Sequence, residues 1–290
     1  MAGADEQTGG DCYELLDAGD GRKLERFGAY VLERPCAQAV WRPRLPRERW
    51  NAADAAFHRE DGSGWSVRTR VPETWIAVVG GLKLELSLTD FGHVGAFPEH
   101  ARVGRWMKEC RFCETGGESQ VSVLNLFAYS GGATLAAASL GWRVCHLDAS
   151  RKMVAWARRN ADLNALGDAP VRWITDDAQK FLGREQRRGT HYDGIILDPP
   201  SFGRGKRQEL FKIDDHLLDI LDACRSVLSQ QPKFVFLSCH TPGYTPLVLR
   251  HLLGQSMTGL GGSIETGEMV LEGSGGALPV PSGTFAVWSI

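Results

Sequence analysis

The sequence lacks the features of membrane-spanning and disulfide-stapled proteins. No apolar run approaches the roughly 18–20 residues that a transmembrane helix needs. Residues 1–11 are small and polar, unlike the apolar core of a secretory signal peptide. The seven cysteines are scattered and odd in number, which favours reduced thiols over a disulfide framework. These absences predict a cytoplasmic protein without a membrane partner.

Charge of one sign is also lacking. The chain carries 33 Lys and Arg against 35 Asp and Glu, a formal net charge of -2. A protein without a global positive field needs a local basic patch to bind a nucleic acid. No metal site is predicted, because Cys110 and Cys113 have no second cysteine pair or histidine at zinc spacing.

Three regions follow from the local patterns. Residues 1–21 are rich in Gly, Ala and Asp and are expected to be poorly ordered. Residues 22–96 are expected to form a small β-rich domain, with a hairpin turn at Gly80-Gly81 and a charged loop over 42–64. Residues 97–290 are expected to form a larger domain.

In the larger domain short apolar runs alternate with amphipathic helical segments. This alternation predicts an α/β fold with a parallel, doubly wound sheet. Two final β-forming runs are expected to make an antiparallel hairpin at the sheet edge. The expected strands are 121–127, 143–148, 171–175, 192–198, 234–239, 263–270 and 284–290, and the expected helices are 133–140, 152–166, 178–187, 217–228 and 246–253.

Ligands of open α/β sheets bind beyond the carboxyl ends of the strands, so the strand ends are the candidate site. After Asn125 the chain turns through Gly131-Gly132, where glycine lets backbone approach a ligand. The helix that follows favours a negatively charged group at its N-terminus. The dinucleotide fingerprint and the phosphate-loop lysine are both missing. An ordinary strand-to-helix turn is the alternative.

Acidic residues end the next two strands. Asp148 can accept hydrogen bonds from both hydroxyls of a ribose, although capping of the following helix is an equally physical role. Asp176 and Asp177 could bind an adenine amine, and Asp177 could equally serve only as an N-cap.

The run Asp198-Pro199-Pro200-Ser201-Phe202 is the most specific signal. Two prolines stiffen the turn after a buried strand. A rigid backbone with one carboxylate suits binding the donor edge of a planar, amine-bearing base, on which Phe202 can stack. A rigid loop with an exposed aspartate is the alternative.

Cys239 ends a further strand, with His240 beside it. A cysteine at a strand end could act as a nucleophile if its pKa were lowered. Neighbouring residues on a strand point to opposite faces, which disfavours a direct Cys–His pair and favours a buried, inert thiol.

Taken in order, these strand-end motifs carry a resemblance. Asn125-x-Phe127-x-Tyr129-Ser130-Gly131, Asp148-x-Ser150, Asp177 and Asp198-Pro199-Pro200-Ser201-Phe202 resemble those of class I S-adenosylmethionine-dependent methyltransferases. More closely, the chain is similar to the bacterial large-subunit rRNA methyltransferases that modify cytosine C5 or guanine N7. The resemblance covers roughly residues 90–290. It implies a Rossmann-like methyltransferase sheet, S-adenosylmethionine as cofactor and a base in RNA as substrate.

The resemblance also implies roles for individual residues. The methionine end of the cofactor is expected against the Phe127–Gly131 loop, its ribose on Asp148 and its adenine on Asp177, and the acceptor base on Asp198. The implied cofactor-binding residues are Phe97, Pro98, Asn125, Phe127, Ala128, Tyr129, Ser130, Gly131, Asp148, Ala149, Ser150, Asp176, Asp177 and Ala178, and the implied catalytic residues are Asp198, Pro199, Pro200, Phe202 and Cys239.

Two departures keep other functions open. Residues 1–96 show no RNA-binding domain of the kind that precedes the cytosine-modifying enzymes. Ser238-Cys239-His240 matches two positions of the Ser-Cys-Ser that carries their nucleophile. Basic stretches at 42–49 and 203–207 could contact RNA phosphates or could be solvated loops. A small molecule or a protein side chain as acceptor, or a non-catalytic cofactor-binding role, are the alternatives.

Overall fold

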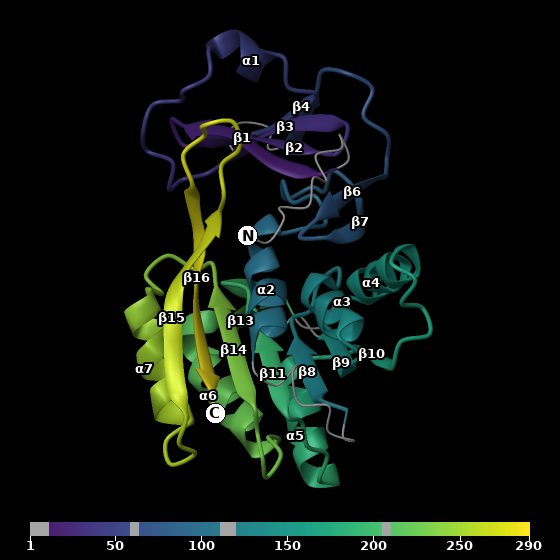
Figure 1. Ribbon diagram of the computed structural model, residues 1–290, viewed down its shortest axis with the longest axis vertical. Coiled ribbons are helices and arrows are strands. Elements are labelled where there is room, and N and C mark those ends of the chain that lie inside the picture. Colours follow the sequence, from purple (N-terminus) through teal and green to yellow (C-terminus); the bar gives the residue numbers. More distant parts are fainter. Residues whose placement is uncertain (1–11, 59–63, 111–119, 205–209) are drawn as a thin grey trace, which may run out of the picture. The chain divides into compact units, whose positions relative to one another are not determined.

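The computed structural model describes residues 12–58, 64–110, 120–204 and 210–290, and these fall into two compact units (Figure 1). Unit 1 comprises Met1–Pro98 and Val270–Pro281, and unit 2 comprises Glu99–Met269 and Ser282–Ile290. Among the residues described, no helix is long and apolar enough to cross a membrane.

Unit 1 is built on a five-stranded sheet in the order β1-β2-β3-β4-β5 and a separate hairpin of β6 and β7. The hairpin predicted at Gly80-Gly81 is confirmed, because both glycines have positive φ and the flanking strands pair antiparallel. Its elements are β1 (Tyr13–Gly19), β2 (Arg22–Phe27), β3 (Tyr30–Pro35), α1 (Arg47–Asn51), β4 (Ala55–His58), β5 (Gly64–Val67), β6 (Trp75–Val79) and β7 (Leu82–Leu86).

A buried ionic network crosses the sheet of unit 1. Glu25 on β2 is fully buried and accepts hydrogen bonds from Arg34 Nε at 2.8 Å and from Tyr13 Oη at 3.0 Å. Lys23 Nζ lies 3.2 Å from the same carboxylate. Burial alone would raise the pKa of Glu25, but the charges of Arg34 and Lys23 and their hydrogen bonds lower it. The ionised carboxylate is therefore a structural element of this sheet.

Unit 1 departs from the sequence-based expectation in three places. Tyr13–Gly19, expected to be poorly ordered, is a strand, while residues 1–11 lie outside the described part. The stretch 42–64, expected as a loop, contains α1 and β4. Val270–Pro281 joins unit 1, because Leu271 and Val280 are buried in one apolar cluster with Leu15. That long-range packing has no local signature.

Unit 2 contains a seven-stranded sheet in the order β10-β9-β8-β11-β14-β16-β15 (Figure 1). Its first five strands run parallel, β16 pairs antiparallel with β14, and β15 lies at the edge. The elements are η1 (Pro98–His100), α2 (Ala101–Glu109), β8 (Ser122–Leu126), α3 (Gly132–Ser139), β9 (Arg143–Asp148), α4 (Arg151–Leu163), β10 (Val171–Thr175), α5 (Ala178–Arg188), β11 (Gly194–Leu197), β12 (Phe202–Arg204), β13 (Leu210–Lys212), α6 (Ile213–Ser226), β14 (Phe234–Cys239), α7 (Pro246–Ser256), β15 (Ser263–Leu271) and β16 (Val280–Ser289).

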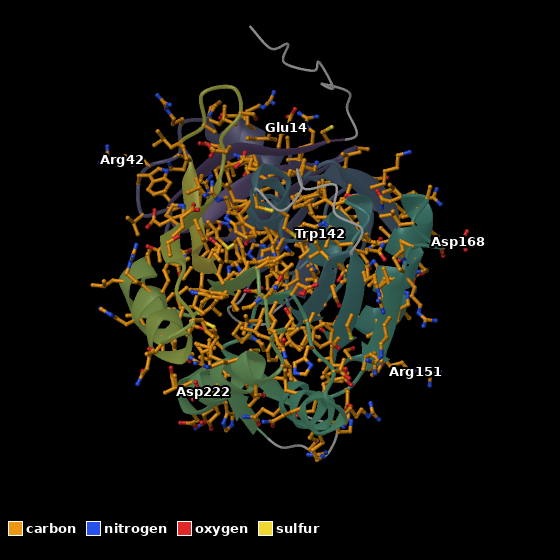
Figure 2. All side chains as sticks on the ribbon, turned by 60° about the horizontal axis from the view of Figure 1, so that its bottom comes forward. Glu14, Arg42, Trp142, Arg151, Asp168 and Asp222 are labelled. Atoms are coloured by element: carbon orange, nitrogen blue, oxygen red, sulfur yellow. The ribbon has the colours of Figure 1, made fainter. Side chains whose placement is uncertain are left out.

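Two apolar cores lie on the two faces of this sheet. Alternate strand residues divide between them, so that Leu124 belongs to the core with α5, α6 and α7, whereas Val123 belongs to the core with α2 and α3. Trp142 lies inside this packing, while Arg151, Asp168 and Asp222 lie at the periphery (Figure 2). The predicted doubly wound, mostly parallel sheet is confirmed.

Candidate active site

The register of the central strands decides which residues meet at the carboxyl edge. Leu197 on β11 pairs with Leu126 on β8 on one side and with Leu237 on β14 on the other. The residues that follow these three are Phe127, Asp198 and Ser238. The chain also reverses its order between β8 and β11, which is the switch point where doubly wound sheets bind ligands.

The loop after β8 is a tight turn. Phe127 and Tyr129 have φ of 56° and 47°, and Gly131 has φ of 95°. Only glycine fits the last position, because a Cβ there would lie 2.9 Å from Ala157 Cβ. The amide of Asn160 on α4 donates to the carbonyl of Ser130 at 2.9 Å and holds the turn against that helix.

Asp148 at the end of β9 ties this turn to the next one. Its Oδ2 accepts from the Tyr129 N–H at 2.9 Å, and its Oδ1 accepts from the Ser150 N–H at 2.8 Å. Burial raises the pKa of Asp148, an effect that these two hydrogen bonds oppose. Each carboxylate oxygen keeps a further lone pair, which is the capacity that a diol ligand requires. Ser150, and not Asp148, caps α4.

Asn125 lies beneath the turn. Its side chain is 3% exposed and donates to Thr134 Oγ1 at 2.9 Å, and Thr134 Oγ1 is 2.9 Å from His146 Nδ1. Burial, helped by the nearby charge of Arg158, lowers the pKa of His146 to about 3. A neutral imidazole therefore completes a chain of hydrogen bonds that fastens α3 to β8 and β9. The described contacts of Asn125 are structural, and a direct cofactor contact stays a prediction.

The acidic pair after β10 serves local structure. Asp177 Oδ1 accepts from the Lys180 N–H at 2.9 Å, so the N-cap role foreseen for Asp177 is confirmed. Asp176 accepts from the Asp177 N–H and forms an ion pair with Arg184. Both side chains are partly exposed, and their contact with an adenine remains a prediction.

Of the small residues predicted to bind the cofactor, some are buried and one is exposed to solvent. Ala128 and Ala178 are buried, and the Ala128 N–H donates to the Leu147 carbonyl at 3.0 Å. Ala149 is exposed. Phe97 and Pro98 belong to unit 1, where the ring of Phe97 lies 5.2 Å from that of His93.

Asp198 lies in a cluster with two histidines. His100 Nε2 is 3.2 Å from Asp198 Oδ2, and His240 Nε2 is 3.5 Å from Asp198 Oδ1. The two Nε2 atoms are 3.3 Å apart, and the rings are stacked with an interplanar angle of 15°. Ser238 Oγ donates to Asp198 Oδ1 at 2.8 Å.

The electrostatics of this cluster favour an ionised Asp198. Burial would raise the pKa of Asp198, but the two imidazoles and the hydrogen bonds from His100 and Ser238 hold it well below its usual range. Burial would lower the pKa of His100, but Asp198 and Glu99 raise it. Each partner thus favours the charged form of the other.

Cys239 lies between two members of this cluster in sequence, Ser238 and His240, but its side chain packs in an apolar core. It is 1% exposed and belongs to the apolar core that includes Leu237 and Leu249. Burial raises the pKa of its thiol, against hydrogen bonds from Thr241 that lower it. A buried cysteine with a raised pKa has the properties of an inert thiol.

The turn after Asp198 presents an aromatic side chain to solvent. Pro199 is buried and Pro200 is exposed, and Phe202 on β12 is 67% exposed. Ser201 Oγ lies 2.7 Å from Thr241 Oγ1, which joins this turn to the end of β14. β12 pairs antiparallel with β13, a ribbon that the sequence reasoning missed. Lys206 and Arg207, named as a basic patch, lie outside the described residues.

Comparison with known proteins assigns the family. The sequence profile of the S-adenosylmethionine-dependent methyltransferase family matches residues 40–233. A solved S-adenosylmethionine-dependent methyltransferase from Agrobacterium tumefaciens is 38% identical, with a TM-score of 0.89 over 98% of this chain and 91% of that chain. The chain belongs to the S-adenosylmethionine-dependent methyltransferase family.

Two further relatives show how far the likeness extends. The ribosomal RNA large subunit methyltransferase K/L of Syntrophotalea carbinolica is 30% identical over 194 residues, which is 66% of this methyltransferase and 25% of the relative. A methyltransferase structure from Streptococcus mutans has a TM-score of 0.75 at 18% identity, covering 98% of this chain and 76% of that chain. At this identity the agreement concerns the fold. The resemblance that the strand-end motifs carry is confirmed.

The residues of this methyltransferase fit the cofactor of its family. A Cβ added at Gly132 would meet nothing within 4 Å, so the N-terminus of α3 has open space beside it. Asp148 keeps lone pairs that could accept hydrogen bonds from a ribose. The turn after β8 passes through Gly131, whose positive φ glycine permits. That these residues bind S-adenosylmethionine stays a prediction.

Sequence reasoning missed two features of the site of this methyltransferase, namely His100 and the contact of Ser238 with Asp198. His100 and His240 are 140 positions apart, and no local pattern joins them. One signal was present, because Ser238 and His240 end the strand beside β11 in the expected sheet order. Pairing the ends of adjacent strands would have brought them to Asp198.

Proposed function

We propose that this methyltransferase methylates a base in RNA, of the ribosomal kind, in the cytoplasm. The observation that carries the proposal is the carboxylate of Asp198, with its lowered pKa, at the switch point of the sheet, followed by a proline-stiffened turn that leads to the exposed ring of Phe202. A planar base needs both an acceptor for its amino group and a stacking surface. The name of the Syntrophotalea relative supports an RNA substrate, although this chain spans only 25% of that relative.

Asp198 has the capacity for this role. A carboxylate offers about four lone-pair sites. Ser238, His240 and His100 approach three of them in the described structure. The remaining site can accept a hydrogen bond from the amine of an acceptor base, while the neighbouring groups fix the orientation of the carboxylate.

The state of Cys239 bears on the acceptor atom. Methylation of cytosine C5 requires a thiolate to attack the ring first, because that carbon is a poor nucleophile. A thiol that is 1% exposed with a raised pKa is poorly suited to this step. We therefore propose a ring or exocyclic nitrogen as acceptor. When bound, S-adenosylmethionine supplies an electrophilic methyl group on a sulfonium, and the protein supplies positioning and exclusion of water.

The cytoplasmic location rests on composition. The seven cysteines are scattered and odd in number, a pattern that favours reduced thiols and thus a reducing compartment. Detection of the full chain in a soluble fraction free of periplasmic markers tests this location.

The central experiment is incubation of the full chain with methyl-labelled S-adenosylmethionine and total RNA that lacks modifications. We expect label on one nucleotide type, at a nitrogen, in large ribosomal RNA. Phe202→Ala should weaken RNA use by about 1–3 kcal/mol, the value of one base stacked on an aromatic ring. Leu247→Ala is the matched control, because Leu247 is an exposed apolar residue on α7. Label on protein or on a small molecule, with none on RNA, would overturn the proposal of an RNA substrate and identify the acceptor as one of these two classes.

A further inference from the structure

We propose that His100, Asp198 and His240 form a binding site for one divalent ion of the zinc class. The proposal goes beyond methyl transfer and holds for any acceptor. All three residues belong to unit 2. His100 ends η1, Asp198 follows β11, and His240 follows β14.

The donor atoms of the three side chains converge on one point. One donor atom from each residue can be chosen so that all lie within 4.8 Å of one another. Both histidines direct Nε2 to this point, 3.3 Å apart, and the Asp198 carboxylate faces both, at 3.2 Å from His100 and 3.5 Å from His240. Two imidazoles and one carboxylate form a common set of three protein ligands for a catalytic zinc ion.

The spacing suits a tetrahedral ion. An ion that binds nitrogen and oxygen at about 2.0–2.1 Å holds neighbouring tetrahedral ligands about 3.3–3.4 Å apart. The two Nε2 atoms are 3.3 Å apart, which matches this value. Asp198 approaches His100 through Oδ2 at 3.2 Å and His240 through Oδ1 at 3.5 Å, so a single carboxylate oxygen must turn toward the ion for all three donors, now within 4.8 Å of one another, to bind it.

Outer contacts orient the ligands in the way that metal sites require. Ser238 Oγ donates to Asp198 Oδ1 at 2.8 Å, which fixes the carboxylate. Glu99 Oε1 lies 3.8 Å from His240 Nδ1, on the side of the ring opposite to the proposed ion. This distance is that of an electrostatic contact and not of a hydrogen bond, and a carboxylate near the second ring nitrogen favours the tautomer that leaves Nε2 as the ligand atom. Glu99 is 6% exposed, and its Oε2 has no hydrogen-bond partner among the described residues.

Gly283 on β16 also limits the position of His240. A Cβ at this residue would lie 2.7 Å from His240 Nδ1, and its φ of 133° disfavours any other residue. The backbone thus approaches the imidazole closely, and this packing restricts the ring to the orientation that faces Asp198 and His100.

The donor set decides the class of ion. Imidazole nitrogen suits Zn²⁺, Co²⁺, Ni²⁺ and Cu²⁺, whereas Mg²⁺ and Ca²⁺ prefer sites made of oxygen donors. Three protein ligands leave one tetrahedral position for water or for an oxygen, nitrogen or sulfur donor of an acceptor. The competing arrangement is a proton shared among the same three groups, and metal titration separates the two.

The test is titration of the full chain with Zn²⁺ by calorimetry and with Co²⁺ by visible absorption, without RNA or S-adenosylmethionine. The reference protein, called the parent chain, and all variants carry Cys110→Ser and Cys113→Ser, so that this cysteine pair does not contribute to metal binding. We expect saturation at one ion per chain and the intense visible bands of tetrahedral Co²⁺. His100→Gln, His240→Gln and Asp198→Asn should each abolish that binding, and Glu99→Gln should weaken it by about 10–100-fold.

His251→Gln is the matched control, because His251 is an exposed histidine on α7. It should bind both ions as the parent chain does. Zn²⁺ should raise the Tm of the parent chain and of the control but leave the three ligand variants unchanged, and circular dichroism checks that each variant is folded. A folded parent chain that binds neither ion overturns the site, and so does equal binding by the folded ligand variants. Because no methyl acceptor is present, failure here is distinct from failure of the RNA proposal.

Discussion

Each unit buries a carboxylate with a lowered pKa, yet the two carboxylates are paired differently. In unit 1, Glu25 is fully buried and faces Arg34 and Lys23, whose side chains act only as hydrogen-bond donors. In unit 2, the Asp198 side chain is 19% exposed and faces two imidazoles, a type of side chain whose ring nitrogens can donate or accept a hydrogen bond. Burial and a shifted pKa alone do not identify a functional carboxylate, whereas the type of partner does.

Position on the sheet supports the same distinction. Glu185 in unit 2 is also buried and binds Arg172 at 3.0 Å and Tyr192 at 2.7 Å. Tyr192 precedes β11, so this network lies at the amino end of the strand that Asp198 ends. Ligands bind at carboxyl ends, and the network of Glu185 therefore belongs with the structural group.

We expect the largest effect on stability from replacing Glu25, the structural carboxylate of unit 1. Glu25→Ala should lower the free energy of unfolding by about 3–5 kcal/mol, because the buried guanidinium of Arg34 loses the carboxylate that balances its charge. Urea denaturation measures this. Glu14→Ala is the control, because its pair with Arg26 is partly exposed and should contribute about 0–1 kcal/mol. Equal losses in the two variants would remove the special status of Glu25.

The pH dependence of this loss sharpens the prediction. Because the folded pKa of Glu25 is lowered, its stabilisation is present above the unfolded value of 4.5 and is lost as the pH falls through the folded pKa. The difference in unfolding free energy between the parent chain and Glu25→Gln should therefore shrink below pH 4.5. Denaturation at a series of pH values measures it, and a difference independent of pH would contradict the ionised state.

Replacing Asp198, the carboxylate of unit 2, should lower the rate of methyl transfer. Asp198→Asn should lower single-turnover methyl transfer by roughly 100-fold, the effect of a misplaced acceptor. Affinity for S-adenosylmethionine should change little, because the contacts of Asp148 are separate. Turnover with labelled cofactor and calorimetry give the two readouts. Unchanged turnover in a folded variant would place the acceptor elsewhere.

Asp148→Asn should weaken cofactor binding and leave turnover nearly unchanged, the reverse of Asp198→Asn. One loop N–H loses its charged acceptor, and a hydrogen bond to a charged group contributes about 1.5–3 kcal/mol. We expect cofactor affinity to fall by about 10–100-fold, with turnover at saturating cofactor nearly retained. Calorimetry with S-adenosylmethionine measures the affinity, and a variant with normal affinity would exclude Asp148 from the cofactor site.

The smallest effect should come from Cys239→Ala. Its thiol is buried in an apolar core with a raised pKa, so removal should cost about 1 kcal/mol of stability and leave turnover nearly unchanged. Complete loss of turnover in the folded variant would restore covalent attack and a cytosine C5 acceptor.

The sequence was most informative where the chemistry follows local order. Asp148 and Asp198 could be located because alternating strands and helices predict a parallel sheet, whose strand ends share one edge. Asn125 and Asp177 show the limit of this reasoning. Each occupies its predicted position, but its described contacts fasten α3 and cap α5. A motif specifies a residue type, while its partner depends on side-chain packing.

The sequence by itself determined the periodicity, the glycine turns and the strand-end carboxylates, because backbone geometry and hydrophobic patterning act over neighbouring residues. Only the tertiary structure decided that His100 and His240, 140 positions apart, meet at Asp198. It also decided that Val270–Pro281 joins unit 1. Contacts of this kind depend on strand register and core packing over the whole chain, which no local window contains.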